Sequence, residues 1–138
     1  MPKDKDKDKV TKPEIGSVKI RWLDDVAEHD YGAAQAYLSL RLGDARATAV
    51  IGRLREADLI TRRANDILRA SRLDPAALED PGVIKDMIKI IEGDELSPIL
   101  LVRDADRTDI ADGFHRVSLV YRIDPYGVIP LRLTDAGA

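Results

Sequence analysis

Apolar positions along the chain fall into two kinds of spacing, one typical of helices and one typical of strands. Residues 31–42 have helical character and are followed by Gly43, a residue type that often ends a helix. Asp44 is suited to cap the next helix, which we expect at 45–57. That segment carries an amphipathic stripe with intervals of three and four, formed by Ala47, Val50, Ile51 and Leu54.

Another helix is expected at 83–92, because Asp80 is a favourable N-cap residue and Pro81 a favourable first-turn residue. The side chains predicted to face the core are Ile84, Met87, Ile88 and Ile91. Those predicted to face water are Lys85, Asp86, Lys89 and Glu92.

Strand spacing appears in four longer segments. Alternating apolar and charged residues predict a half-buried strand at 17–23. The apolar run within 98–103 is typical of a strand buried on both faces, and a return strand at 108–112 would complete a hairpin. A final strand is expected at 128–133, where Pro130 indicates an edge position or a strand end.

Two shorter elements lie between the second helix and the helix at 83–92. Residues 59–61 are expected to be extended, and a short helix is expected to run through residues 67–70. Asn65 or Asp66 is the predicted cap of that helix. The complete set of segments predicts an α+β fold.

The chain has 138 residues, 44% hydrophobic and 34% charged, enough for one domain with one core. Alternating lysine and aspartate predict a disordered charged tail at 1–14, which leaves a single domain at 15–138. With a net charge of −3 and no apolar run of about 18 residues, we expect no membrane partner. We expect a cytoplasmic location, with which the absence of cysteine is compatible. The absence of cysteine excludes disulfides, thiol catalysis and cysteine-ligated metals.

Candidate chemistry concentrates in the sequence Asp112-Gly113-Phe114-His115-Arg116, where a strand, a tight turn and a helix at 115–122 are expected to meet. A helix start presents free backbone N–H groups and a partial positive charge, so it attracts phosphate. Arg116 can grip two phosphate oxygens or form an ion pair with Asp112. His115 can bind phosphate, transfer a proton, or hydrogen-bond to backbone. Asp112 can coordinate Mg²⁺, act as a base, or only shape the turn.

This sequence resembles the D-G-x-H-R box of the ParB/sulfiredoxin superfamily. The resemblance extends back through 98–102 and the helix at 83–92, and forward through 128–131. It implies a small mixed sheet with packed helices, with 31–70 as a helical subdomain inserted after the first strand. It also implies that nucleotide phosphates bind at the helix start. The residues then expected to contact a nucleoside triphosphate or diphosphate with Mg²⁺ are Pro98, Gly113, Phe114, His115, Arg116 and Ser118.

The chain departs from two branches of this superfamily. In sulfiredoxin the third box residue is the reactive cysteine, whereas Phe114 stands here, so sulfinic-acid repair by that thiol is excluded. In the chromosome-partitioning ParB proteins a helix-turn-helix domain follows, whereas this sequence ends at Ala138. The resemblance is therefore closer to single-domain members, some of which are nucleotide-dependent kinases and some of which are reported as nucleases.

An acidic stretch at 24–30 follows the first expected strand. Carboxylates favour the positive end of a helix, so this stretch can be a capping loop. It can also supply a base or metal ligand beside the phosphate site. The resemblance points to the second role, because an acidic residue in this region acts in phosphoryl transfer in some members; Glu28 and His29 occupy roughly that place.

Residues 41–72 contain eight arginines and four acids, a local balance of +4. This surplus is compatible with DNA binding, with ion pairs inside the fold, or with a protein partner or a homodimer contact through the helical insertion. The arginines proposed for nucleic acid are Arg53, Arg62, Arg63 and Arg69.

Three functions follow from these observations. The first is a nucleotide-binding enzyme, a phosphotransferase or NTPase, with phosphates at residues 113–116 and catalytic roles for Asp112, His115 and Glu28. The second is a DNA-binding protein or nuclease that uses the arginine-rich region. The third is a non-catalytic interaction module.

Overall fold

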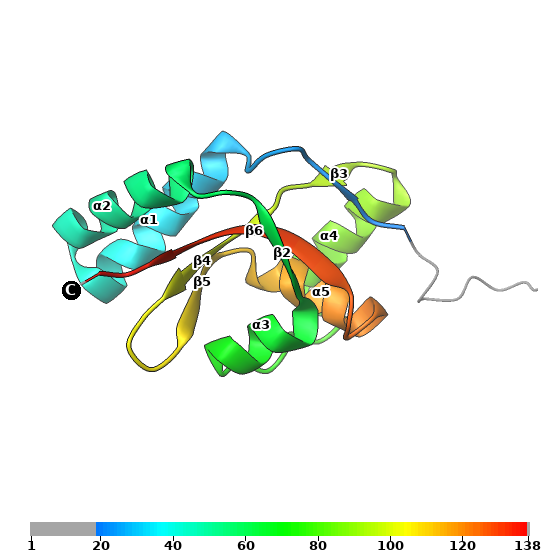
Figure 1. The fold of residues 1–138 in the computed structure, drawn as a ribbon. Coiled ribbons are helices and arrows are strands. Elements are labelled where there is room, and N and C mark those ends of the chain that lie inside the picture. Colours follow the sequence, from blue (N-terminus) through cyan, green and yellow to red (C-terminus); the bar gives the residue numbers. More distant parts are fainter. Residues whose placement is uncertain (1–18, 138) are drawn as a thin grey trace, which may run out of the picture.

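The computed structural model describes residues 19–137, so the expected tail at 1–14 lies outside it. Within that range the fold is α+β, as predicted from the sequence (Figure 1). The helices are α1 (Glu28–Leu42), α2 (Asp44–Glu56), α3 (Ala64–Ser71), α4 (Pro81–Ile91) and α5 (Phe114–Ile123). The strands are β1 (Arg21–Trp22), β2 (Ile60–Arg63), β3 (Glu95–Leu96), β4 (Ile99–Arg103), β5 (Thr108–Asp112) and β6 (Val128–Asp135).

The main sheet has the strand order β2-β6-β4-β5. Strands β4 and β5 form the predicted antiparallel hairpin, β6 runs parallel to β4, and β2 runs antiparallel to β6. Strand β4 is buried on both faces, as its continuous apolar run predicts. Helices therefore have to cover both faces of the sheet.

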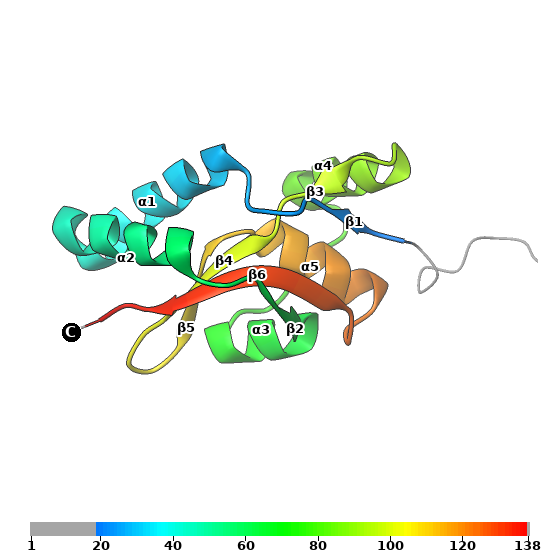
Figure 2. The ribbon, with the colours of Figure 1, turned by 45° about the horizontal axis from the view of Figure 1, so that its top comes forward.

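Helices α1 and α2 lie on one face of the sheet, and α3 and α5 on the other (Figures 1 and 2). The stripe predicted for α2 is confirmed, because its four apolar residues are buried together with Leu100 and Val102. On the opposite face, side chains of α3 and α5 pack with Ile99, Leu101 and Ile129. Alternate residues of β4 thus point into two separate cores.

The first strand differs from the prediction. Only residues 21–22 of the expected strand 17–23 are a strand in the described range, and residues 17–18 lie outside it. This strand pairs in parallel with β3, and the two form a small sheet of their own instead of joining the main one. The alternating pattern predicted a half-buried strand but did not identify its partner.

Pro130 does not mark an edge strand, because β6 pairs with β2 on one side and β4 on the other. The ladder with β4 begins at Leu131, whereas Pro130 pairs only with Thr61 of β2. Proline lacks an N–H group, and at this position β6 has a hydrogen-bonding neighbour on one side only. Pro130 is therefore tolerated within a strand that is internal to the sheet.

The predicted cap of α4 is confirmed, since the Asp80 carboxylate accepts a hydrogen bond from the Gly82 N–H at 2.8 Å. The helix itself begins at Pro81, two residues before the expected start. The predicted core face of this helix is wrong. Ile84, Ile88 and Ile91 are 44%, 48% and 76% exposed. The buried residues are instead Val83, Asp86 and Ile90, with Met87 partly buried. Apolar side chains extend around more of the α4 surface than β3 and α5 can bury, so some of them stay exposed.

The region 31–70 contains more than helices. The extended piece expected at 59–61 is part of a longer strand, since residues 60–63 form the edge strand β2 of the main sheet. The predicted capping residues also differ: α2 already begins at Asp44 after Gly43, and α3 begins at Ala64 with no side-chain cap. No helix of residues 19–137 has the length and apolar character needed to cross a membrane.

Candidate functional site

Gly113 forms the tight turn between β5 and α5. Its φ is +117°, a backbone conformation that side chains disfavour, and a Cβ there would lie 2.4 Å from the Ile99 side chain. Glycine is therefore required at this position. Helix α5 starts immediately afterwards at Phe114, and no side chain caps its first turn. The first-turn N–H groups are thus available to a ligand.

The start of α4 lies directly against the start of α5. A Cβ at Gly82 would fall 2.6 Å from the His115 ring, so the imidazole packs on the backbone of α4. The His115 Nε2 atom also lies 3.2 Å from Asp80 Oδ1. Gly82 thus permits the two helix starts to approach, and Asp80 holds the His115 ring between them.

The start of α1 completes the site. No side chain caps this helix either, and the Ala27 N–H that precedes it donates to Ser97 Oγ at 2.9 Å. The three helix starts surround a polar pocket of about 320 Å³. Its lining residues are His29, Asp30, Gly82, Lys85, Asp86, Lys89, Asp112, Gly113, Phe114, His115 and Arg116. Three positive helix ends and two lysines together favour an anionic ligand.

Arg116 is held between two carboxylates. Its Nη1 atom donates to Asp30 Oδ2 at 3.2 Å and its Nη2 atom to Asp112 Oδ2 at 2.8 Å. The ion pair with Asp112 considered from the sequence is therefore present, and Asp30 extends it to a clamp. Both terminal nitrogens of the Arg116 guanidinium are engaged in these ion pairs, so Arg116 positions the two acids within the pocket.

Two of the pocket's carboxyl groups have shifted pKa values. Burial raises the pKa of Asp112, and the charge of Asp30 adds to the rise, while Arg116 opposes it. Burial likewise raises the pKa of Asp86. The buried Asp86 side chain forms no hydrogen bond and no ion pair with another residue of the range 19–137. A carboxyl group with a raised pKa is better able to exchange a proton near neutral pH.

Three residues proposed from the sequence lie outside the pocket lining. Glu28 is exposed and forms a two-pronged ion pair with Arg55, at 2.6 and 2.9 Å, which lowers its pKa. Ser118 is fully buried and accepts the Ala76 N–H at 2.9 Å. Pro98 is buried, and its carbonyl accepts a hydrogen bond from Ser97. The acidic residue that the acidic stretch does bring to the site is Asp30.

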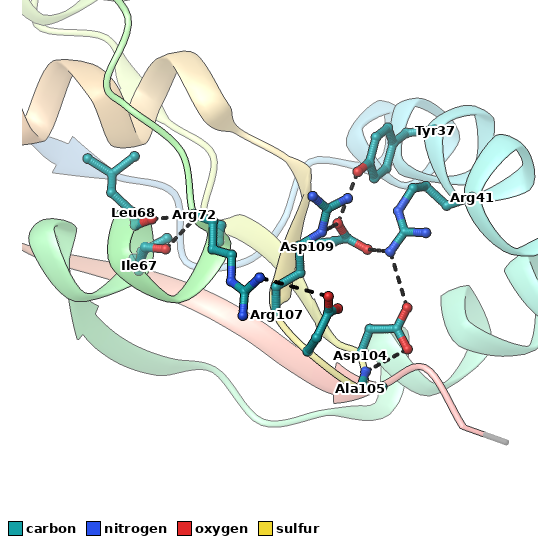
Figure 3. A network of polar contacts seen from close by, with 11 residues as sticks. Tyr37, Arg41, Ile67, Leu68, Arg72, Asp104, Ala105, Arg107 and Asp109 are labelled. Carbon is teal, nitrogen blue, oxygen red and sulfur yellow. Dashed lines mark hydrogen bonds and ion pairs between the residues drawn. The ribbon is translucent and has the colours of Figure 1, made fainter.

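Most arginines of the 41–72 region have partners inside the protein. Figure 3 shows Arg41 of α1 between Asp109 and Asp104 of the β4–β5 hairpin, with Nη2 to carboxylate distances of 2.7 and 3.1 Å. Tyr37 donates to the same Asp109 at 3.1 Å (Figure 3). This network fixes α1 against β5 and therefore fixes Asp30 relative to Asp112.

The four arginines proposed for nucleic acid lie on three elements. Arg53 of α2 donates to the Asp135 carbonyl, and Arg69 of α3 pairs with Asp66. Arg62 of β2 donates to the Thr61 carbonyl, whereas the exposed side chain of Arg63 has no hydrogen bond or ion pair to residues 19–137. Nucleic-acid binding by this region stays a prediction.

A larger hollow of about 560 Å³ lies between β1, the end of α5 and β6. Its lining is mostly apolar and includes Asp24 and Asp124 but no basic residue. The charge of that hollow does not suit a phosphate group. Residues 19–137 also contain no cluster of three or more acidic or histidine side chains arranged to hold a metal ion.

Comparison of the chain with protein-family models, with curated proteins and with solved structures gives no match. The ParB/sulfiredoxin resemblance therefore stays a prediction from the box and its frame. Sequence reasoning missed Lys85, Asp86 and Lys89, because the helical pattern assigned all three to solvent. The signal that could have located them is Gly82, since a glycine in the first turn of α4 allows a neighbour to approach closely.

Proposed function

We propose that this protein binds the phosphates of a nucleotide in the pocket where α1, α4 and α5 begin, with a fold of the ParB/sulfiredoxin kind. The observation that carries the proposal is the convergence of three helix starts with Lys85 and Lys89 on one polar pocket. Each helix start contributes partial positive charge, and the starts of α1 and α5, which no side chain caps, also offer unpaired N–H donors. Asp80 already caps α4, so that helix contributes its dipole and its two lysines. Helix dipoles and lysines together offset the three carboxylates of the pocket.

Within the proposed site each group has a distinct role. The first-turn N–H groups of α5 bind phosphate oxygens, and Lys85 and Lys89 neutralise their charge from the side of α4. Arg116 keeps Asp30 and Asp112 in place. Asp112, whose pKa is raised by burial, accepts the proton of an attacking hydroxyl or water. This arrangement corresponds to a phosphotransferase or NTPase, in which positioning and charge neutralisation supply most of the catalysis.

Mg²⁺ fits this site only as a companion of the phosphates. The described residues provide no three-ligand cluster, and Mg²⁺ commonly binds through one or two carboxylates plus substrate phosphates. Asp112 and Asp30 are the candidate carboxylates. When bound, the ion would neutralise charge on the phosphates and orient them.

The first experiment is thermal unfolding with ATP, ADP, CTP or GTP, each with Mg²⁺, and with inorganic tripolyphosphate. A ligand present at about 100 times its dissociation constant adds about 2.7 kcal/mol to stability, which raises Tm by several degrees. The test variant is Lys85→Gln/Lys89→Gln, which removes two charges from partly or fully exposed positions. The matched control is Lys19→Gln, an exposed lysine outside the pocket.

We expect at least one nucleotide to stabilise the wild type and the Lys19→Gln control, and the double variant to lose that stabilisation. Stabilisation that survives in the double variant would place the nucleotide elsewhere. Absence of any shift would refute nucleotide binding. Phosphate release from the bound nucleotide, lost in Asp112→Asn, separates an enzyme from a non-catalytic interaction module.

A further inference from the structure

Helix α4 presents three different surfaces to its surroundings. Val83 and Ile90 pack in the core with Leu96 and Leu119. Lys85, Asp86 and Lys89 line the polar pocket. The third surface is an apolar stripe of Ile84, Ile88 and Ile91, whose spacing of four and three places them on one face of the helix.

This isoleucine stripe is unusual for a surface. Three branched apolar side chains are exposed side by side, and α4 lies at the periphery of the fold, beside β3 (Figure 2). Single exposed apolar residues are ordinary, whereas a contiguous exposed apolar patch marks an interaction surface. None of the three isoleucines lines the polar pocket, although Lys85 borders both surfaces.

We propose that the isoleucine stripe is a homodimer interface, in which α4 packs antiparallel against α4 of a second copy. A twofold axis near Ile88 would place each stripe on the other, because an isologous interface uses the same patch on both subunits. This interface differs from the helical insertion at 31–70, where the sequence suggested a homodimer contact.

The charges beside the stripe favour a second copy as the occupant. Lys85 lies three residues before Ile88 and Glu92 four residues after it, so both border Ile88 on the helix surface. The two are seven residues apart and therefore lie on the same side of the helix. Antiparallel pairing then brings Lys85 of each copy to Glu92 of the other, and the symmetric arrangement forms this ion pair twice.

The size of the surface sets the expected affinity. Helix α4 has 11 residues, about 16 Å of helix, so the contact is small compared with a stable dimer interface. We therefore expect a weak, concentration-dependent dimer. Sedimentation of the wild type should show a rising mean mass across micromolar to submillimolar concentrations, and Ile88→Asp should remain a monomer.

The absence of cysteine from the chain permits a direct test of the geometry. Ile88→Cys places one thiol close to the proposed axis, so mild oxidation should link two copies through a single disulfide. Leu40→Cys is the matched control, because Leu40 is 89% exposed on α1, outside the stripe. Equal cross-linking of the two variants, or none in Ile88→Cys at high concentration, would overturn the proposal.

A charge exchange distinguishes a second copy from other occupants. Lys85→Glu alone should weaken self-association about tenfold, since two ion pairs per dimer become repulsive contacts. Lys85→Glu/Glu92→Lys should restore it, because both pairs form again with reversed signs. Failure of the double variant to recover would show that the antiparallel register is incorrect.

Discussion

The ion pairs of Arg116 with Asp30 and Asp112 allow a quantitative prediction about the free energy of unfolding. Arg116 is 13% exposed and Asp30 6% exposed, so Arg116→Ala leaves two poorly solvated carboxylates without their cation. Removing one partner of a buried ion pair typically costs about 3–5 kcal/mol. Asp112 retains partial contact with solvent, so we expect about 3 kcal/mol, at the lower end of that range.

The loss should depend on pH. Without the cation, the folded-state pKa of Asp112 rises further, because nothing then offsets its burial and the charge of Asp30. A raised folded pKa means that stability is lost as pH rises through the interval between the unfolded and folded values. The difference between wild type and Arg116→Ala should therefore be large at pH 7 and shrink toward the unfolded pKa of about 4.

Urea unfolding provides the assay, followed by far-UV circular dichroism and by fluorescence of the single tryptophan, Trp22. Arg63→Ala is the matched control, since the exposed side chain of Arg63 has no hydrogen bond or ion pair to residues 19–137. We expect that control to change stability by less than about 0.5 kcal/mol. A loss below about 1 kcal/mol for Arg116→Ala at pH 7 would refute the clamp, and a loss independent of pH would refute its electrostatic origin.

Three further substitutions test the supports of the site, each by urea unfolding. Asp86→Asn should be more stable than wild type by about 1 kcal/mol at pH 7, because it removes a buried charge without a close ion pair. This difference in stability should disappear as pH falls through the folded and unfolded pKa values of Asp86, because the carboxyl group is then neutral in both states. A difference that persists at low pH would show that the buried charge is not its cause. Gly113→Ala should lose about 2–4 kcal/mol through positive φ and contact with Ile99, and an unchanged midpoint would exclude that strain. Ser118→Ala should lose about 1–3 kcal/mol because the Ala76 N–H loses its partner, and a neutral result would mean that water replaces it.

Local sequence signals predicted the frame of the candidate site. The start of α4 follows from Asp80 and Pro81, whose effects are confined to one helical turn. The β4–β5 hairpin and the start of α5 after Gly113 were also predicted, within a residue at the helix start. Helix capping, turn conformation and the spacing of apolar residues depend on neighbours in the chain. A short stretch of sequence is therefore enough to predict these elements.

The pairing of distant residues was not predictable in the same way. Asp30 and Arg116 are 86 positions apart, and no spacing rule relates them. The acidic stretch identified the right region, but Glu28 faces Arg55, whereas His29 and Asp30 line the pocket. One turn of a helix rotates neighbouring residues to different faces, so the packing of α1 on the sheet selects which acid reaches the site.

The sequence by itself determined the five helices, the four strands of the main sheet, the cap of α4 and the amphipathic character of α4, but it did not indicate β3. Only the tertiary structure decided which part of the apolar arc of α4 is buried, because β3 and α5 cover Val83 and Ile90 but leave Ile88 exposed. The convergence of three helix starts is likewise a tertiary result. Periodicity fixes the relative directions of side chains on one element, whereas burial depends on the surfaces that other elements bring against it.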